Sequence, residues 1–296
     1  MTTTRVLGSV DVRRPSTAWS LLRLSRPQQW HKGLMVYAAP AAAGVLDRPD
    51  LLLRATIAAI SFVLLSVSVY AFNDVQDAAD DRRHPTKRNR PVASGMIPRT
   101  AAWTWGVVTG LVGLACASTL GNQTLGIGAF YLVTSLLYVY WLKRVAVVDV
   151  VVVALGFVLR AIAGGTATGI ELSTWFLAVS LFGALFLVAG KRRAQLGSKR
   201  FTGPAYTASW LDQLLTVSLL GTSLSYGLWA YQYLGPDMHS IPLALSFVPF
   251  LTGLLRYALL VSAGHGERPE ADLFRDPVLL LTGLTWAVTV GIGLYL

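Results

Sequence analysis

Long uncharged, apolar runs recur along the chain, and each has about the length of a membrane-spanning helix. The hydrocarbon core of a bilayer is about 30 Å thick, so a helix that rises about 1.5 Å per residue crosses it in about 20 residues. Four runs each fit one crossing: residues 55–73, 172–190, 213–236 and 277–296. The pattern therefore predicts an all-α, polytopic membrane protein.

The remaining apolar segments supply five more predicted crossings. The uncharged stretch 100–142 is about twice too long for one helix, and the Gly-Asn-Gln sequence at 121–123 supplies a turn that divides it into two. Residues 145–165 and 238–255 predict one crossing each. The first crossing should begin near Pro27, because the apolar run that follows is too short by itself. We thus expect nine transmembrane helices.

Composition agrees with this class of protein. Hydrophobic residues make up 54% of the 296 residues and charged residues only 14%, which leaves too little polar surface for a soluble domain. The single cysteine, Cys116, allows neither a disulfide within the chain nor a CxxC metal site. We expect one transmembrane catalytic domain, residues 16–296, after a mobile N-terminal tail, residues 1–15.

The Lys and Arg residues are concentrated in alternate connections between the predicted helices. Of the 25 Lys and Arg residues, 21 fall in the N-terminal segment or in every second connection after it, and only Arg48 and Arg54 lie in the other connections. Because basic loops stay in the cytoplasm, this alternation predicts a multi-pass plasma-membrane protein with a cytoplasmic active face. The net charge of +10 does not indicate a nucleic-acid partner, since the basic residues are split among short loops instead of forming one stripe.

Acidic side chains gather directly after the predicted span 55–73. At about 100° per residue, Asn73, Asp77 and Asp81 lie on one helix face, with Asp74 and Asp80 beside them. Converging carboxylates repel one another unless a cation joins them, and oxygen-only ligands suit Mg²⁺. We predict a magnesium diphosphate site with Asn73, Asp74, Asp77 and Asp81 as ligands. The alternative is a solvated helix end whose acids pair with the basic residues that follow.

A basic loop follows these acids. His84-Pro85 should stop the helix, and Lys87, Arg88 and Arg90 could then fold back over the metal and neutralise phosphate charge. We predict that Asp77, Asp81, Lys87 and Arg90 act in catalysis. The alternative is that the three cations are ordinary cytoplasmic anchors of the neighbouring helices.

Two further features place charge at or inside the bilayer. Asp149 and Arg160 lie three helical turns apart in the span 145–165, where ionisable groups usually face a polar cavity. Asp149 could instead pair with Lys143 or Arg144 at the interface. The Gly-Lys-Arg-Arg sequence at 190–193 ends a span on the same side as the acids, and it either binds an anion or stops the helix at the membrane surface.

These residues resemble the UbiA-type prenyltransferase superfamily, and within it the decaprenyl-phosphate phosphoribosyltransferase branch. The resemblance covers nearly the whole chain from about residue 21. It rests on RPQQWHK from residue 26, NDVQDAADD from 73, NRPVASG from 89, LKR from 142 with Asp149, FVLR from 157, GKR from 190 and the stretch 266–276.

The resemblance implies a bundle of nine helices whose cytoplasmic cavity binds magnesium at Asn73, Asp77 and Asp81. Prenyltransferases of this fold carry a second aspartate-rich motif near the end of the sixth helix, where this chain has Lys191, Arg192 and Arg193. This departure argues against transfer of a prenyl group to an aromatic ring. The loop 266–277 also departs from the branch, with about one extra residue.

The implied reaction transfers 5-phosphoribose from phosphoribosyl diphosphate to a polyprenyl phosphate, as a step toward cell-wall arabinan. The implied substrate-binding residues are Lys87, Arg88, Arg90, Lys143, Arg144, Asp149, Arg160, Lys191 and Arg192. One alternative is prenyl transfer to a quinone or haem precursor. The other is a transporter of a phosphorylated solute, which is less favoured because the charged groups are concentrated on one side. The oligomeric state stays open, a homo-oligomer included.

Overall fold

The described part of a computed structural model comprises residues 16–196, 204–232, 240–267 and 269–296, and the predicted tail 1–15 lies outside it. These residues form helices and turns and contain no strand, so the all-α prediction is confirmed. The helices are α1 (Thr17–Leu24), η1 (Pro27–Tyr37), α2 (Ala38–Ala42), α3 (Pro49–Arg83), η2 (Lys87–Asn89), α4 (Arg99–Ser118), α5 (Asn122–Tyr140), η3 (Leu142–Arg144), α6 (Val148–Thr168), α7 (Thr174–Leu196), α8 (Ala208–Tyr231), α9 (Ser240–Leu245), α10 (Phe247–Ser262), α11 (Pro269–Arg275) and α12 (Pro277–Tyr295).

Seven segments in the described part of the chain are helical, long and apolar enough to cross a membrane. They are α3, α4, α5, α6, α7, the stretch 241–262 formed by α9 and α10, and α12. The predicted turn between α4 and α5 is confirmed at Gly121, whose φ of 119° is a conformation that favours glycine. Seven of the nine predicted crossings therefore have the helix that the sequence predicts.

The other two predicted crossings differ from a regular apolar helix. Helix α8 has 24 residues and is long enough to cross, but it is not among these seven segments, and it carries Asp212, Gln213 and several Ser and Thr residues. The first segment begins at Pro27 as expected, yet it runs as the 3-10 helix η1 and the five-residue α2. A Cβ at Gly164 of α6 would lie 1.8 Å from the carbonyl oxygen of Val36, so η1 lies directly against α6.

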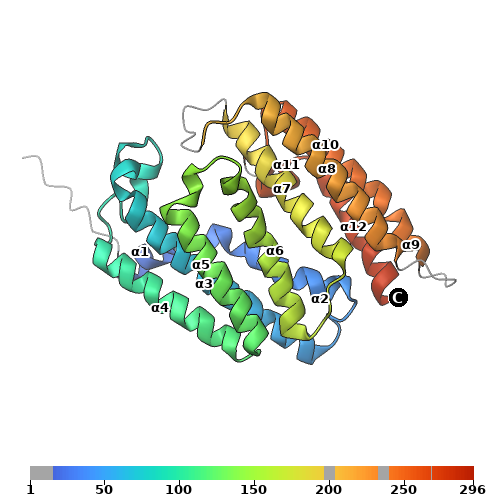
Figure 1. The fold of residues 1–296 in the computed structure, drawn as a ribbon, viewed down its shortest axis with the longest axis horizontal. Helices are drawn as coiled ribbons and strands as arrows, with labels where there is room; N and C mark the ends of the chain where they lie inside the picture. Colours follow the sequence, from blue (N-terminus) through green and yellow to red (C-terminus); the bar gives the residue numbers. More distant parts are fainter. Residues whose placement is uncertain (1–15, 197–203, 233–239, 268) are drawn as a thin grey trace, which may run out of the picture.

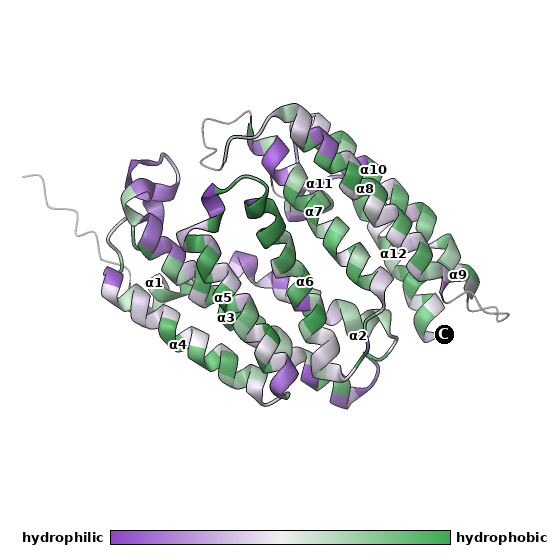
Figure 2. Ribbon diagram, viewed as in Figure 1, coloured by the Kyte–Doolittle hydropathy of each residue, from purple (hydrophilic) through white to green (hydrophobic). Residues whose placement is uncertain are grey.

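Helix α3 lies at the centre of the first half of the bundle. It packs against α4, α5, α6 and η1, while α7, α8, α10 and α12 form the second half, which α6 joins through α7 (Figure 1). Close packing of α3 and α4 depends on small residues, because a Cβ at Gly106, Gly110 or Gly113 would meet α3 side chains at about 3 Å. Apolar residues cover most of the helices, and hydrophilic ones gather at their ends (Figure 2).

Candidate functional site

The predicted acidic motif forms the last turns of α3, which continues unbroken to Arg83. His84 then leaves the helix in an extended conformation before Pro85, as predicted. The motif divides by burial: Asp74 and Asp81 are buried, whereas Asn73 and Asp77 are half-buried. The helix thus presents oxygen atoms toward the interior of the bundle at one of its ends.

Two of these carboxylates are neutralised by cations from other segments. The Arg90 Nη1 atom lies 2.7 Å from Asp81 Oδ2, so the loop after α3 does fold back onto the acidic motif. Lys143, in η3, places its Nζ atom 2.5 Å from Asp77 Oδ1. Asp80 is different, because it is exposed and its ion-pair partner among the described residues is Arg83, one turn along the same helix. The predicted alternative of a solvated helix end describes Asp80, but Asp81 is buried and Asp77 pairs with a residue that does not belong to the loop after α3.

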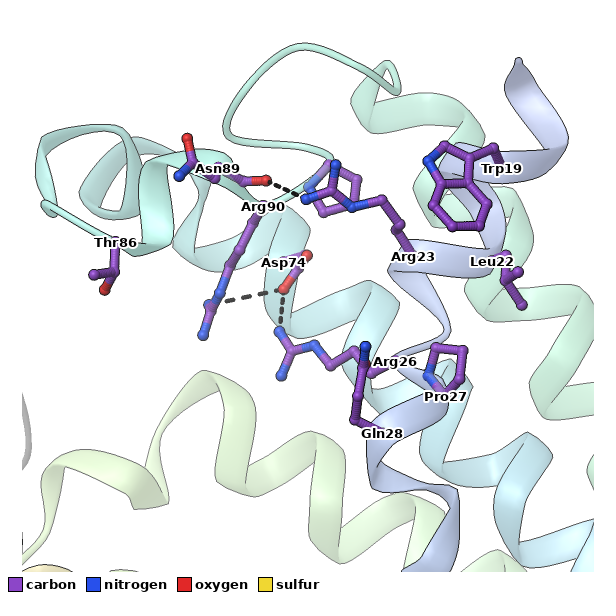
Figure 3. Close-up of a pocket in the computed structure, with 11 residues that line it drawn as sticks. Trp19, Leu22, Arg23, Arg26, Pro27, Gln28, Asp74, Thr86, Asn89 and Arg90 are labelled. Atoms are coloured by element: carbon purple, nitrogen blue, oxygen red, sulfur yellow. Dashed lines mark hydrogen bonds and ion pairs between the residues drawn. The ribbon is translucent and has the colours of Figure 1, made fainter. Parts of the chain in front are cut away.

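Asp74 lies between two arginines. Its side chain is 1% exposed, forms an ion pair with Arg26 and has Arg90 Nη1 3.7 Å from Oδ1 (Figure 3). Arg26 adopts a φ of 49°, which is strained for a residue other than glycine, and its guanidinium lies 5.0 Å from the Tyr70 ring centroid. These contacts differ from the predicted role of Asp74 as a metal ligand.

A cavity of about 650 Å³ adjoins Asp74 between α1, the start of η1 and the loop after α3 (Figure 3). Its lining mixes cationic and apolar side chains. The lining residues are Trp19, Leu22, Arg23, Arg26, Pro27, Gln28, Asp74, Thr86, Asn89, Arg90 and Pro91. The sequence singled out Arg90 and Asp74 but not Arg26, although Arg26 opens the RPQQWHK motif. The cavity is therefore a place where an anionic group would meet several positive charges.

The acidic face fits a hard divalent cation by the chemistry of its donors. Asn73, Asp77 and Asp81 are four residues apart on α3 and offer only oxygen atoms. No group of three or more His, Cys, Asp and Glu side chains in the described part of the chain is arranged to hold a metal. Since the predicted set has only two clustered carboxylates and one amide, water and substrate oxygens would have to complete the coordination.

The three cations of the basic loop have different surroundings. Lys87 is half-buried, and burial followed by the positive charge of Arg90 lowers the pKa of its ammonium group. The carboxylates of Asp81 and Asp77 act in the opposite direction, so Lys87 lies close to the acidic face. Arg88 is exposed. The structure therefore brings Lys87 and Arg90, but not Arg88, to the site.

Asp149 is fully buried at the start of α6 and pairs with Arg192 of α7. Arg192 Nη2 lies 2.9 Å from Asp149 Oδ2 and 3.3 Å from the Tyr138 hydroxyl oxygen. The Tyr206 hydroxyl also donates to Asp149 and accepts from the backbone N–H of Val147 at 2.8 Å. The predicted alternative, a pair between Asp149 and Lys143 or Arg144, is wrong: Lys143 binds Asp77, and Arg144 is exposed.

Arg160 is buried in the middle of α6, at 5% exposure. Its Nη1 donates to the carbonyl of Gly156 at 2.6 Å, and its Nη2 donates to Ser66 Oγ and the Tyr131 hydroxyl, both at 2.8 Å. Lys191 is exposed at the end of α7. The predicted substrate-binding residues thus do not form one cluster: some lie at the end of the bundle, Arg160 lies in its interior, and Arg88, Arg144 and Lys191 are exposed.

Comparison with known proteins agrees with this architecture. The UbiA prenyltransferase family matches residues 33–275. A decaprenyl-phosphate phosphoribosyltransferase from Mycobacterium tuberculosis is 42% identical over 282 residues, covering 92% of this chain and 93% of the relative. The protein of the same name from Mycolicibacterium smegmatis is 36% identical, covering 93% of this chain and 92% of the relative.

More distant proteins share the fold. A protoheme IX farnesyltransferase from Hyphomonas neptunium is 26% identical, covering 97% of this chain and 96% of the relative. A UbiA homologue from Archaeoglobus fulgidus, solved with GPP and Mg²⁺, superposes with a TM-score of 0.73 at 18% identity, covering 93% of this chain and 98% of that one. The chain belongs to the UbiA prenyltransferase family.

Proposed function

We propose that this member of the UbiA family transfers 5-phosphoribose from phosphoribosyl diphosphate to decaprenyl phosphate or a similar polyprenyl phosphate, with release of diphosphate. The mycobacterial relatives that align over nearly its whole length carry the name of this activity. The observation that supports it within the chain is Arg192. A cation fixed by Asp149 occupies the end of α7, where a prenyl diphosphate site would need acids.

Asn73, Asp77 and Asp81 would hold Mg²⁺, and related structures of this fold contain that ion. Bound there, the ion would offset negative charge on the departing diphosphate. Asp77 and Asp81 now pair with Lys143 and Arg90. If these carboxylates bound a metal, Lys143 and Arg90 would be free to bind diphosphate oxygens.

The chain's own cations would stabilise the developing charge. Lys87 and Arg90 lie beside the acidic face, where they can donate to the leaving diphosphate as the bond between ribose carbon 1 and its oxygen breaks. An oxygen of the acceptor phosphate forms the new bond to carbon 1. Because that phosphate is already anionic, no strong general base is needed.

Asp74 would act by positioning these groups. It is buried between Arg26 and Arg90, and it holds both guanidiniums at the wall of the cavity. This role replaces the predicted one as a metal ligand. Removal of the Asp74 charge should therefore disturb the positions of Arg26 and Arg90 more than the affinity for the metal.

The active face would lie in the cytoplasm of a plasma-membrane protein with nine crossings. The alternation of basic loops supports this orientation. The acidic face, Arg192 and the basic loop all belong to the ends of helices that the alternation places inside. The product would serve as a precursor of cell-wall arabinan.

The proposed function is tested with purified protein, labelled phosphoribosyl diphosphate, decaprenyl phosphate and Mg²⁺. We expect a labelled lipid product that also carries the donor's 5-phosphate, together with an equal amount of diphosphate. Hydrolysis of the donor without a lipid product would contradict the proposal.

A further inference from the structure

Two cations from separate segments lie against one aromatic ring inside the bundle. The Lys32 Nζ atom of η1 and the Arg160 Cζ atom of α6 are each 5.9 Å from the ring centroid of Phe157, also in α6. The contact of η1 with α6 brings them together. A Cβ at Gly33 would lie 2.9 Å from a Val63 methyl group, so the neighbour of Lys32 also fixes η1 against α3.

Arg160 has a positive charge but forms no ion pair with an acidic side chain among the described residues. Its hydrogen bonds go to the carbonyl of Gly156 and to the hydroxyls of Ser66 and Tyr131, all of which are neutral. The side chain is about nineteen-twentieths buried, and its Nε atom has no hydrogen-bond partner among the described residues. Burying a charge without a counter-ion is costly, so a site of this kind is stabilised when an anion joins it.

Lys32 adds to this uncompensated charge. It is half-buried, and Lys191, Arg160 and Arg26 are close enough to repel its ammonium group. Glu270 attracts it, but neither Lys32 nor Arg160 forms an ion pair with a carboxylate in the part of the chain described here. Lys32 and Arg160 therefore bring an excess of positive charge to the Phe157 ring, and neither takes part in the ion pairs of Asp77 and Asp81.

We propose that Lys32 and Arg160 bind a phosphate monoester at a second anion site on the Phe157 side of the bundle. A phosphate monoester fits because it carries close to two negative charges and three acceptor oxygens, which can accept from both cations. The inference rests on the proposed function, in which two substrates supply such a group: the 5-phosphate of the donor and the monophosphate of the lipid. Lys32 then becomes a substrate-binding residue and not merely a basic anchor.

The first test measures protection of Lys32 in the wild-type protein. An amine-reactive reagent is applied in inorganic phosphate and in chloride at equal ionic strength, and the modification of each lysine is followed by mass spectrometry. We expect phosphate to slow modification of Lys32 severalfold, and ribose 5-phosphate or a short-chain polyprenyl phosphate to do so at lower concentration. Whichever of the two protects better identifies the source of the phosphate. Unchanged modification of Lys32 with all three ligands would overturn the proposal.

The second test uses Lys32→Met, with Lys32→Arg as the conservative variant. The matched control is Arg48→Met, because Arg48 precedes α3 at the end away from the acidic motif. Loss of one charge-assisted contact costs about 1.5 to 3 kcal/mol, which corresponds to a rise in KM of about tenfold to a hundredfold. We expect that rise in Lys32→Met for the substrate identified above, with the Mg²⁺ dependence unchanged. Lys32→Arg keeps the positive charge and should recover most of the lost affinity, whereas Arg48→Met should stay within about threefold of wild type. Normal KM values for both substrates in Lys32→Met would contradict the proposal.

The proposed transfer of phosphoribose and the proposed anion site at Lys32 are contradicted by different results. If the protein does not transfer phosphoribose, the protection of Lys32 by inorganic phosphate is still measurable, and its presence would leave the anion site standing. If transfer occurs and Lys32 is neither protected nor needed, the proposed function stands and the second anion site is wrong.

Discussion

The buried carboxylate of Asp149 forms an ion pair of 2.9 Å with the guanidinium of Arg192, and this pair joins the start of α6 to the end of α7. Tyr138 and Tyr206 complete the group by hydrogen bonds to Arg192 and Asp149 respectively. The cation at the end of α7 is therefore held in a fixed position, which an anion-binding residue needs.

Arg192→Met should destabilise the protein, because it leaves the Asp149 carboxylate buried without a cation. Breaking a buried pair in this way costs about 3 to 5 kcal/mol. We expect a clear fall in the melting temperature of the detergent-solubilised protein, and Asp149→Asn in the same chain should restore most of it. The control is Arg193→Met, since Arg193 pairs with the exposed Asp212. An Arg192→Met protein as stable as Arg193→Met would show that the ion pair is unimportant.

Asp77→Asn and Asp81→Asn should each abolish transfer without unfolding the protein. Each change removes a carboxylate that would bind the metal and leaves the diphosphate charge less compensated. Asp80→Asn is the matched control, because Asp80 belongs to the same motif but is exposed and pairs with Arg83. The measurement is the initial rate as a function of Mg²⁺ concentration. Near-normal rates of Asp77→Asn and Asp81→Asn at low Mg²⁺ would rule out the metal site.

Asp74→Asn separates a positioning role from a metal role. We expect a lower rate of transfer, because Arg26 and Arg90 lose the buried carboxylate between them. The Mg²⁺ concentration for half-maximal rate should stay at the wild-type value. A large increase in that concentration, equal to the one expected for Asp77→Asn, would instead make Asp74 a ligand as the sequence alone suggested.

The pH dependence of donor binding should report on Lys87. Burial and Arg90 hold the pKa of this lysine below its ordinary value, so its charge is lost at a lower pH than in the unfolded chain. The KM for phosphoribosyl diphosphate should therefore rise as pH increases through that lowered pKa. The folded protein binds the Lys87 proton less tightly than the unfolded chain does. The free energy of unfolding should therefore also increase as pH rises from the lowered pKa to the ordinary one.

The control for Lys87 is the variant Lys87→Arg, whose guanidinium keeps its charge at alkaline pH. We expect its KM to stay constant over the range in which the wild-type KM rises. An identical pH profile for the two proteins would assign the titration to another group.

The sequence predicted the elements better than it predicted their partners. Local geometry alone determines the turn at Gly121 and the helix face shared by Asn73, Asp77 and Asp81. The structure has this turn, and it has an unbroken helix through residues 73–81. The pair between Arg26 and Asp74 joins residues 48 positions apart. Such pairs depend on how two helices are rotated and tilted against one another, and the 3.6-residue period does not specify those angles.

The first segment shows a second limit. Its length and Pro27 predicted the start of a crossing, but the close contacts of Val36 with Gly164 and of Gly33 with Val63 arise only when η1 packs against α6 and α3. Those contacts accompany a 3-10 conformation and put Lys32 beside Phe157. The sequence alone identified Lys32 only as one of several basic residues on the predicted cytoplasmic side.

A choice of substrates decides whether the donor is phosphoribosyl diphosphate. The wild-type protein is offered phosphoribosyl diphosphate with decaprenyl phosphate, and separately a prenyl diphosphate with 4-hydroxybenzoate, under matched conditions. We expect labelled phosphoribosyl lipid in the first reaction and no prenylated product in the second. Robust prenylation of 4-hydroxybenzoate without phosphoribosyl transfer would contradict the proposed function and would leave only the fold.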